Sequence, residues 1–376
     1  MRTIVVVPDS FKSTMSSTRV CEIMVRALTR HLDTKVVALP VADGGEGTID
    51  AYLAAVGGRT VTMAVTGPVG EPVEAFLGLL SNGTAVVEMA AAAGLPLVRG
   101  QIKPERTTTY GVGELILAAA RAGAARIIVG LGGSATTDMG TGAAAAVGVR
   151  FLDESGKEFV PLSGTLDKIS HVDISGLDPR VRDAEIQVMC DVDNPLYGPQ
   201  GAAYVFGPQK GADPDLVKRL DQGLRHAAMV VKQDLHTDVS TIQGAGAAGG
   251  MGAGMGAFFG ATLNRGIDIV LDTIGFDKVI HGADLVITGE GCLDAQSLDG
   301  KVIVGVAHRA SAHNVPVIAV VGDIRDGFEP IYEQGVWAVF STNTRAVPFA
   351  EARQHAEHDL ALTMDNIARI LALSSQ

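Results

Sequence analysis

Residues 1–31 read MRTIVVVPDSFKSTMSSTRVCEIMVRALTRH and combine an apolar run, a polar loop and a periodic segment. The β-branched run Thr3–Val7 predicts a strand, and apolar residues at helical spacing predict a helix over 17–31. Strand, loop and helix in this order are typical of a βαβ unit with a parallel sheet. The polar loop 8–12 would then lie at the carboxyl end of its strand, where open parallel sheets bind ligands.

The same rhythm recurs at both ends of the chain. Further strands are predicted at Lys35–Leu39, Ala125–Val129, Leu285–Thr288 and Val315–Val321, each followed by a loop rich in glycine or acidic residues. A helix is expected near Ile49–Val56, and an amphipathic helix over Phe349–Leu373.

The middle of the chain has a different pattern. It holds a predicted strand at Ala85–Met89, an irregular stretch over 151–179 and a glycine-rich tract near 244–260. The pattern therefore predicts an α/β protein in which both chain ends, 1–66 and 282–376, form one doubly wound domain. A second α/β domain, 67–281, would be inserted into it, and a sequential split near residue 150 is the alternative.

Composition excludes several classes of protein. The 376 residues carry 30 Lys+Arg against 42 Asp+Glu, a net charge of −12, and only 5% are aromatic. Such a chain offers neither a phosphate-neutralising surface nor stacking platforms, so nucleic acid is not expected as a partner. The three cysteines form no CxxC pair, which favours a reducing cytoplasm. The N-terminal apolar run is too short for a signal peptide, and no membrane partner is expected.

The loop Asp43-Gly-Gly-Glu-Gly-Thr48 places two carboxylates around a glycine turn after a predicted strand. Asp43 and Glu46 would suit a hard cation such as Mg²⁺, or the glycines would let backbone amides approach a phosphate. An acidic surface turn is the alternative.

The loop Gly130-Leu-Gly-Gly-Ser-Ala-Thr-Thr-Asp-Met-Gly140 is the best candidate anion cradle. Gly132, Gly133 and Ser134 would approach a phosphate, and Ser134, Thr136 and Thr137 could cap the following helix. The N-terminus of that helix would offer free amides to the anion. A tight turn without a ligand is the alternative, and the loop also matches a weak dinucleotide fingerprint.

Three further loops carry acidic groups or lysines. Cys190-Asp-Val-Asp-Asn-Pro195 provides Asp191 as a candidate base, with an Asx turn as the alternative. Lys12 and Lys210 lie on loops, where solvated lysines are also common. The loop after the strand at 285–288 combines Glu290 with Lys301. Carboxylates and lysines beside glycine loops, without Cys or His ligands, indicate Mg²⁺-dependent phosphoryl transfer on a small anionic ligand.

Several motifs in order carry a resemblance to a known family: IVVVPDSFKSTMSS, VADGGEGT, VVEMAAAAGL, TTTYGVGELI, VGLGGSATTDMGTG, CDVDNPLYGPQGAAYVFGPQKGA, GAGAAGGMGAG and ITGEGCLDAQSLDGK. Together they resemble the bacterial glycerate kinase family, collinearly from residue 3 to beyond 320. The resemblance implies a flavodoxin-like domain built from both termini, an inserted α/β domain and an active site in the cleft between them. It also implies transfer of the γ-phosphate of ATP to D-glycerate with Mg²⁺. The expected product is 2-phosphoglycerate, with 3-phosphoglycerate as the alternative.

The resemblance and the motifs together yield hypotheses for individual residues. Asp191 is the expected base, and Asp43 is expected to act in catalysis and, with Glu46, to hold Mg²⁺. Lys12 and Lys210 are expected on the glycerate carboxylate or the γ-phosphate. The remaining expected contacts are Ser10 and Asn194 to substrate, and Gly132, Gly133, Ser134, Glu290 and Lys301 to the nucleotide.

Two positions depart from the family pattern. Cys292 stands where an arginine is common, and Ile303 stands where a proline is usual. The loss of that arginine weakens the expectation that the 289–301 loop contacts nucleotide phosphates. A nicotinamide-dependent oxidoreductase using the 130–135 loop and a non-catalytic sugar-acid sensor are the competing functions. Homo-oligomerisation is left open.

Overall fold

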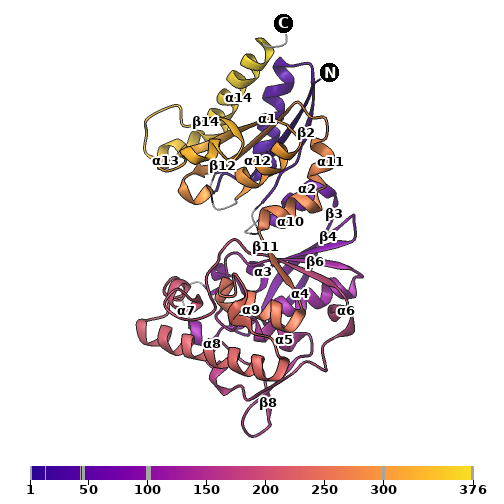
Figure 1. Cartoon of the computed structure of the whole chain (residues 1–376), viewed down its shortest axis with the longest axis vertical. Helices are drawn as coiled ribbons and strands as arrows, with labels where there is room; N and C mark the ends of the chain where they lie inside the picture. The colour runs from indigo at the N-terminus through magenta and orange to yellow at the C-terminus, as the bar shows by residue number, and fades with distance from the viewer. Residues whose placement is uncertain are drawn as a thin grey trace. The chain divides into compact units, whose positions relative to one another are not determined.

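The computed structural model describes residues 2–12, 14–42, 44, 47–98, 103–298 and 301–373. The chain divides into two compact units. Unit 1 comprises Met1–Asp43, Asp50–Gly57 and Arg265–Gln376, and unit 2 comprises Gly44–Ile49 and Gly58–Asn264. Figure 1 shows that elements from both ends of the chain, coloured indigo and orange to yellow, make up unit 1.

Unit 1 is built on a five-stranded sheet in which every pairing is parallel. The strands run in the order β14 (Val336–Ser341), β13 (Val317–Ile324), β12 (Leu285–Leu293), β1 (Arg2–Pro8) and β2 (Thr34–Ala38). Its helices are α1 (Ser17–His31), α2 (Thr48–Val56), α10 (Gly266–Thr273), α11 (Phe276–Ile280), α12 (Val302–Ala312), α13 (Phe349–Ala352) and α14 (Ala356–Leu373). The boundary with unit 2 falls within α2.

One face of this sheet is covered by α1 and α14, which lie side by side (Figure 1). Ile4 and Val6 of β1 and Leu285 and Ile287 of β12 share a buried apolar cluster with these helices. Because side chains alternate between the faces of a strand, the residues between them lie on the opposite face. The helix α12 packs against β1, β12 and β13.

Unit 2 contains a six-stranded sheet in the order β11 (Thr262–Asn264), β10 (Glu185–Met189), β6 (Arg126–Gly130), β5 (Thr84–Glu88), β4 (Pro72–Leu80) and β3 (Gly58–Thr66). The first four strands are parallel, and β4 and β3 are antiparallel to their neighbours. A small antiparallel sheet joins β7 (Arg150–Leu152), β8 (Glu158–Phe159) and β9 (His171–Asp173).

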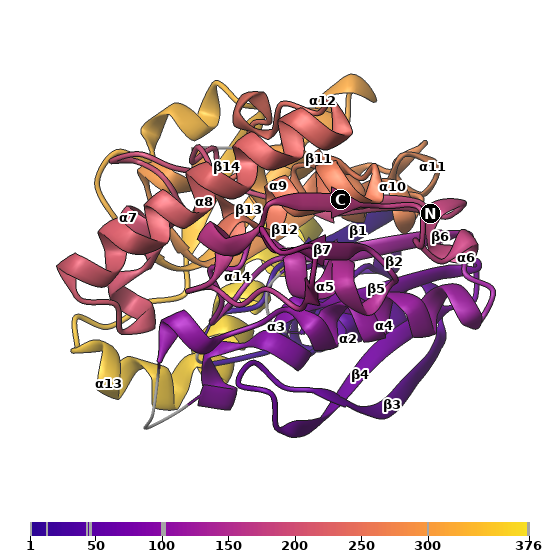
Figure 2. The ribbon, with the colours of Figure 1, turned by 90° about the horizontal axis from the view of Figure 1, so that it is seen from below.

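The helices of unit 2 are α3 (Met89–Ala93), α4 (Tyr110–Arg121), α5 (Thr141–Ala146), α6 (Pro179–Arg182), α7 (Ala202–Phe206), α8 (Pro214–Leu235) and α9 (Ala247–Phe259). Figure 2 shows α4 running beside β4 and β5, which it contacts. The buried faces of α4, α8 and α9 contribute to one apolar core.

The helix predicted over 17–31 is confirmed with the same bounds. The mixed α/β class with parallel sheets is confirmed as well. The single helix expected over 349–373 is instead divided into α13, a 3₁₀ turn at Arg353–His355 and α14. The stretch expected to be irregular, 151–179, holds the small sheet.

The unit boundaries also differ from those expected. Strand β3, expected within the segment 1–66, pairs with β4 along its whole length and so belongs to unit 2. The helices α10 and α11, expected within 67–281, belong to unit 1, where both pack on α12. The unit of β3 therefore follows from its strand partner, and the unit of α10 and α11 follows from the helix on which they pack.

The glycine-rich tract forms a buried helix, α9, which has a kink where Ala248, Gly249 and Gly250 take the left-handed conformation. An added Cβ at Gly254 would lie 2.1 Å from the carbonyl oxygen of Met139. At Gly256 the nearest atom to an added Cβ is Cδ1 of the Ile242 side chain, at 2.8 Å. Gly254 therefore permits close packing against the segment before α5, whereas Gly256 faces a side chain.

We predict that Gly254→Ala lowers the thermal midpoint by about 4–8 °C, because about 2 kcal/mol of overpacking against rigid backbone outweighs the gain in helix propensity. Gly256→Ala is the matched control on the same helix, since the end of the Ile242 side chain can move. It should stay within about 3 °C of the wild type. Thermal unfolding followed by circular dichroism measures both, and equal midpoints would contradict the packing argument.

Candidate functional site

In unit 1 the candidate residues gather at the carboxyl ends of β1 and β12. The two strands run in register, with Pro8 opposite Gly289, and the Asp9 amide donates to the Gly289 carbonyl at 2.8 Å. This pairing places the loop with Ser10 and Lys12 beside the end of β12. Ser10 is half-buried and Lys12 is exposed.

Glu290 is the residue after Gly289 within β12, and its side chain is only 6% exposed. Its Oε1 atom is buried and accepts no hydrogen bond from any described residue. Burial raises the pKa of Glu290 to about 7. A hydrogen bond from the Ser297 side chain and the charges of Lys301 and Lys12 oppose that rise in pKa, whereas Asp294 adds to it.

Lys301 stands at the start of α12, in an extended conformation and half-buried. Within the described part of the chain, no side chain caps the N-terminus of this 11-residue helix. The first amides of a helix lack partners within the helix and carry partial positive charge. Lys301 and the first turn of α12 therefore form a positively charged rim near Glu290, at the edge where phosphate contacts were expected.

A cavity of about 140 Å³ opens at the same edge of unit 1. Lys12, Gly291, Asp323, Asn343 and Arg353 are among the residues that line it. Its walls combine two cationic side chains with two carboxylates, since Asp359 also lines it, and with an amide. This chemistry suits a polar ligand.

In unit 2, Gly132, Gly133 and Ser134 form the loop after β6, as expected. Gly132 and Gly133 are exposed, and Ser134 is buried. Gly133 takes a φ of +73°, which favours glycine, and its carbonyl accepts the Leu95 amide at 2.9 Å. The loop is thus tied to the segment that follows α3.

The prediction that Ser134, Thr136 or Thr137 caps the following helix is wrong. The helix α5 begins only at Thr141, and the amides of Gly140 and Gly142 donate to the Asp138 carboxylate at 3.2 and 3.3 Å. The hydroxyls of Thr136 and Thr137 are buried and have no hydrogen-bond partner among the described residues. The protein's own carboxylate therefore occupies the helix terminus that was expected to receive an external anion.

Asp138 is fully buried and accepts two more hydrogen bonds from Thr109, from the amide at 2.7 Å and from the hydroxyl at 2.8 Å. Burial raises the pKa of Asp138, and these hydrogen bonds oppose the rise. Sequence reasoning missed this residue. Its signal was a lone acidic residue inside the GGSATTDMG motif, followed by a glycine.

Lys210 is the other correction, because a loop lysine was expected to contact substrate or phosphate. The side chain is only 1% exposed, and Nζ donates to the Thr136 carbonyl at 2.6 Å. Burial lowers the pKa of Lys210 to about 8, and the charge of Asp138 opposes this decrease. Lys210 thus binds the backbone of the segment after β6.

Asp191 and Asn194 follow the end of β10, as predicted. Asp191 is exposed, whereas Asn194 is half-buried and donates from Nδ2 to the Gln200 carbonyl at 2.9 Å. The neighbouring Asp193 accepts a hydrogen bond from Gln243. The parallel pairing of β6 with β10 brings this loop and the loop with Gly132 to the same edge of the unit 2 sheet.

The expected magnesium ligands, Asp43 and Glu46, lie outside the described residues. Among the residues that are described, no group of three or more His, Cys, Asp or Glu side chains could hold a metal ion. Their role therefore stays a prediction.

Comparison with known proteins now adds to this geometry. The sequence profile of the Glycerate kinase family matches residues 4–372. The chain belongs to the glycerate kinase family. It is 46% identical to the "Glycerate kinase" of Bacillus subtilis (strain 168) over 374 residues, covering 99% of this chain and 98% of that protein. It is 45% identical to the "Glycerate 2-kinase" of Escherichia coli (strain K12) over 373 residues, covering 98% of each.

A solved crystal structure assigned to glycerate kinase 2 of Salmonella typhimurium LT2 superimposes with a TM-score of 0.91 at 43% identity. The match covers 100% of this chain and 99% of that one. The architecture described above is therefore shared with a solved structure of the glycerate kinase family.

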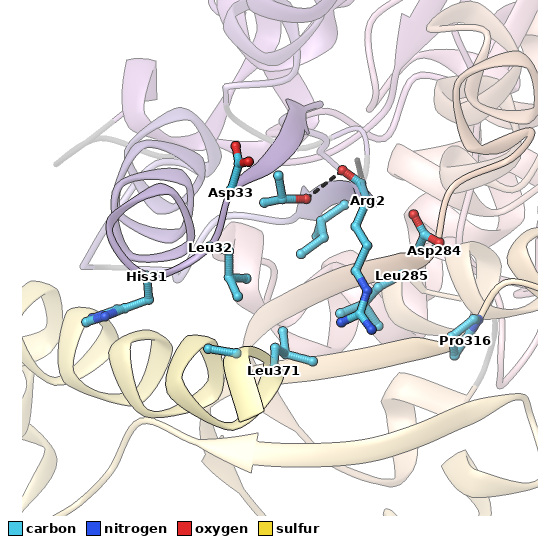
Figure 3. Close-up of a pocket in the computed structure, with 11 residues that line it drawn as sticks. Arg2, His31, Leu32, Asp33, Asp284, Leu285, Pro316 and Leu371 are labelled. Atoms are coloured by element: carbon cyan, nitrogen blue, oxygen red, sulfur yellow. Dashed lines mark hydrogen bonds between the residues drawn. The ribbon is translucent and has the colours of Figure 1, made fainter. Parts of the chain in front are cut away.

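A second, larger cavity of about 560 Å³ lies at the opposite edge of the unit 1 sheet, at the amino ends of its strands. Figure 3 shows its lining, with Arg2 at the start of β1, His31 at the end of α1 and Asp284 just before β12. None of the residues predicted for this kinase family's chemistry lines it. No helix in the described ranges is long and apolar enough to cross a membrane.

We predict that the stability of the wild type relative to Lys210→Met rises between pH 8 and pH 9.5. The folded state has a Lys210 pKa of about 8, whereas an unfolded lysine titrates near 10.4, so the unfolded chain binds more protons in this range. The expected increase is roughly 1–2 kcal/mol. Urea unfolding of both proteins at pH 7, 8 and 9.5 measures it. A difference that does not change with pH would contradict the buried ammonium.

Proposed function

We propose that this chain transfers the γ-phosphoryl group of ATP to a hydroxyl of D-glycerate, with Mg²⁺, and forms 2-phosphoglycerate. The observation that carries the proposal is the 45% identity over 98% of both chains to the Escherichia coli protein named glycerate 2-kinase. The carboxylates and lysines at the carboxyl ends of the strands support it. Phosphoryl transfer depends mainly on positioning and charge neutralisation, and these are the groups that provide both.

The strand order of unit 1 supports a flavodoxin-like assignment for its sheet. Numbered within the unit, the five parallel strands run 2-1-3-4-5. This is the order of flavodoxin-like doubly wound folds, which bind ligands outside the carboxyl ends of their strands. Ser10, Lys12 and Lys301 follow those strands, and Glu290 lies within the last four residues of β12.

Each unit contains candidate residues for the proposed reaction. In unit 1, Lys12 and Lys301 supply positive charge for phosphate oxygens, next to the cavity that Lys12 lines. In unit 2, the loop with Gly132, Gly133 and Ser134 and the loop with Asp191 and Asn194 share one edge of the sheet and are candidates for polar contacts to substrate or nucleotide.

Mg²⁺ would be held by Asp43 and Glu46, whose carboxylate oxygens are ligands of the type that this ion prefers. When bound, the ion neutralises charge on the phosphate oxygens. The net charge of −12 makes such neutralisation necessary for two anionic substrates.

The decisive experiment incubates the protein with D-glycerate, ATP and Mg²⁺ and identifies the product by phosphorus NMR. A 2-phosphoglycerate signal supports the proposal, and 3-phosphoglycerate would correct the hydroxyl that is phosphorylated. Absence of both products would refute the kinase function for this chain. Protection against thermal unfolding by NADH but not by Mg·ATP would favour the oxidoreductase instead.

We predict that Lys12→Met lowers kcat/KM by about 10- to 100-fold, because a charged hydrogen bond to a phosphate or carboxylate contributes about 1.5–3 kcal/mol. Lys35→Met is the matched control. Lys35 is an exposed lysine of β2 near the amino end of the strand, so its removal changes the net charge equally. Steady-state kinetics with ATP and with glycerate varied in turn measures both variants. An equal effect of the two substitutions would mean that Lys12 acts only through the net charge of the protein and makes no direct contact with a substrate.

A further inference from the structure

Glu290 is a buried carboxylate whose hydrogen-bonding capacity is not filled. It lies at the carboxyl end of β12, the central strand of the unit 1 sheet, and is 6% exposed. Its Oε1 atom is buried without a donor from any described residue. Leaving a buried polar atom unpaired is costly, and a catalytic role is one of the reasons for which native proteins retain such atoms.

The orientation of Glu290 follows from the strand. Leu285 and Ile287 belong to the cluster under α1 and α14, so Glu290, at odd spacing from both, leaves the sheet on the opposite face. The helix α12 packs on β12, and its first residue is preceded by Lys301. The carboxylate thus lies near the positively charged end of that helix.

The polar and charged groups around Glu290 come from three segments. Ser297 accepts the Asp294 amide at 3.2 Å, and its side chain hydrogen-bonds to Glu290. The other charged or titratable groups near Glu290 are Lys12 from the loop after β1, Lys301 before α12, Asp294 after β12, and Cys292 on β12 itself. Two cations therefore offset part of the cost of burying this carboxylate.

Asp191, the base expected from the sequence, has a different environment. It lies in unit 2 and is exposed to solvent, whereas Glu290 is buried. A general base works best when its pKa lies near the working pH. Burial raises the pKa of Glu290 to about 7, so this carboxylate meets the criterion.

We propose that Glu290 is the catalytic residue that accepts the proton of the glycerate hydroxyl during phosphoryl transfer. This inference rests on the proposed kinase function and assigns one step within it. As the O–H bond breaks, the proton passes to Oε1 of Glu290. The hydroxyl oxygen bonds to the γ-phosphorus, and the bond from that phosphorus to the β,γ-bridging oxygen breaks. The electron pair leaves with ADP, and Glu290 later releases the proton to solvent.

The proposal has a pH signature with a defined sign. Only the ionised carboxylate can accept a proton, so kcat/KM should fall as the pH decreases through the pKa of Glu290, about 7. Lys301 holds that pKa down, so Lys301→Met should move the acid limb to higher pH.

The test compares pH profiles of kcat/KM from pH 5.5 to 9 for the wild type, Glu290→Gln, Asp191→Asn and Lys301→Met. We expect Glu290→Gln to lose about 10²-fold or more in kcat and to lose the acid limb. Asp191→Asn should keep the limb, and Lys301→Met should shift it upward. A limb retained by Glu290→Gln, or a change confined to its Mg²⁺ requirement, would overturn the assignment.

A measurement without turnover covers the case in which a variant folds poorly. Carbon-13 NMR of wild-type protein labelled at the glutamate carboxyl carbon should show one resonance titrating near pH 7. If every glutamate resonance titrates near the ordinary value of about 4.3, the proposal is overturned. Wild-type protein that forms no phosphoglycerate would refute the kinase function and the proton-acceptor role together. Product formation with an unchanged limb in Glu290→Gln would refute only the latter.

Discussion

The Asp138 carboxylate organises unit 2 because it is a buried charge with a full set of donors. It accepts hydrogen bonds from Thr109 at the start of α4 and from Gly140 and Gly142 at the start of α5. Removing any donor would leave part of a buried charge unpaired, which is far costlier than losing a surface contact. The segment between β6 and α5 therefore has little freedom to move. The loop with Gly132 belongs to the same segment, so we expect it to be held in place as well.

Two further contacts involve the same segment. Lys210 donates to the Thr136 carbonyl. Gly249 and Gly254 of α9 lie so close to the carbonyl oxygens of Thr136 and Met139 that a Cβ atom would clash with them. The glycine-rich tract and the buried lysine thus serve one purpose, which is to fix the position of a short backbone segment. Glu290 in unit 1 is the contrasting case. It too is buried, but one of its oxygens lacks a donor among the described residues.

The parts of the fold that could be predicted from sequence depend on short-range patterns. The helix over 17–31 and the strand ends beside Lys12, Gly132 and Asp191 follow from local periodicity and loop composition. The role of Lys210 could not be predicted, because its partner Thr136 is 74 residues away and a lysine between glycines reads as exposed. The predicted boundaries of the two units were wrong for the same reason, since they also depend on contacts between distant segments. The pairing of β3 with β4 decides its unit, and the apolar pattern of β3 alone does not.

The charge balance around Glu290 connects nucleotide binding to proton transfer under the proposed function. In the free protein, Lys12 and Lys301 oppose the effect of burial on the pKa of Glu290. Phosphate oxygens that engage those lysines would bring negative charge close to the carboxylate and raise its proton affinity. Binding of the nucleotide would then strengthen the base that the acceptor hydroxyl requires. A protein with a net charge of −12 could use the same two lysines to attract its phosphate donor and to tune its proton acceptor.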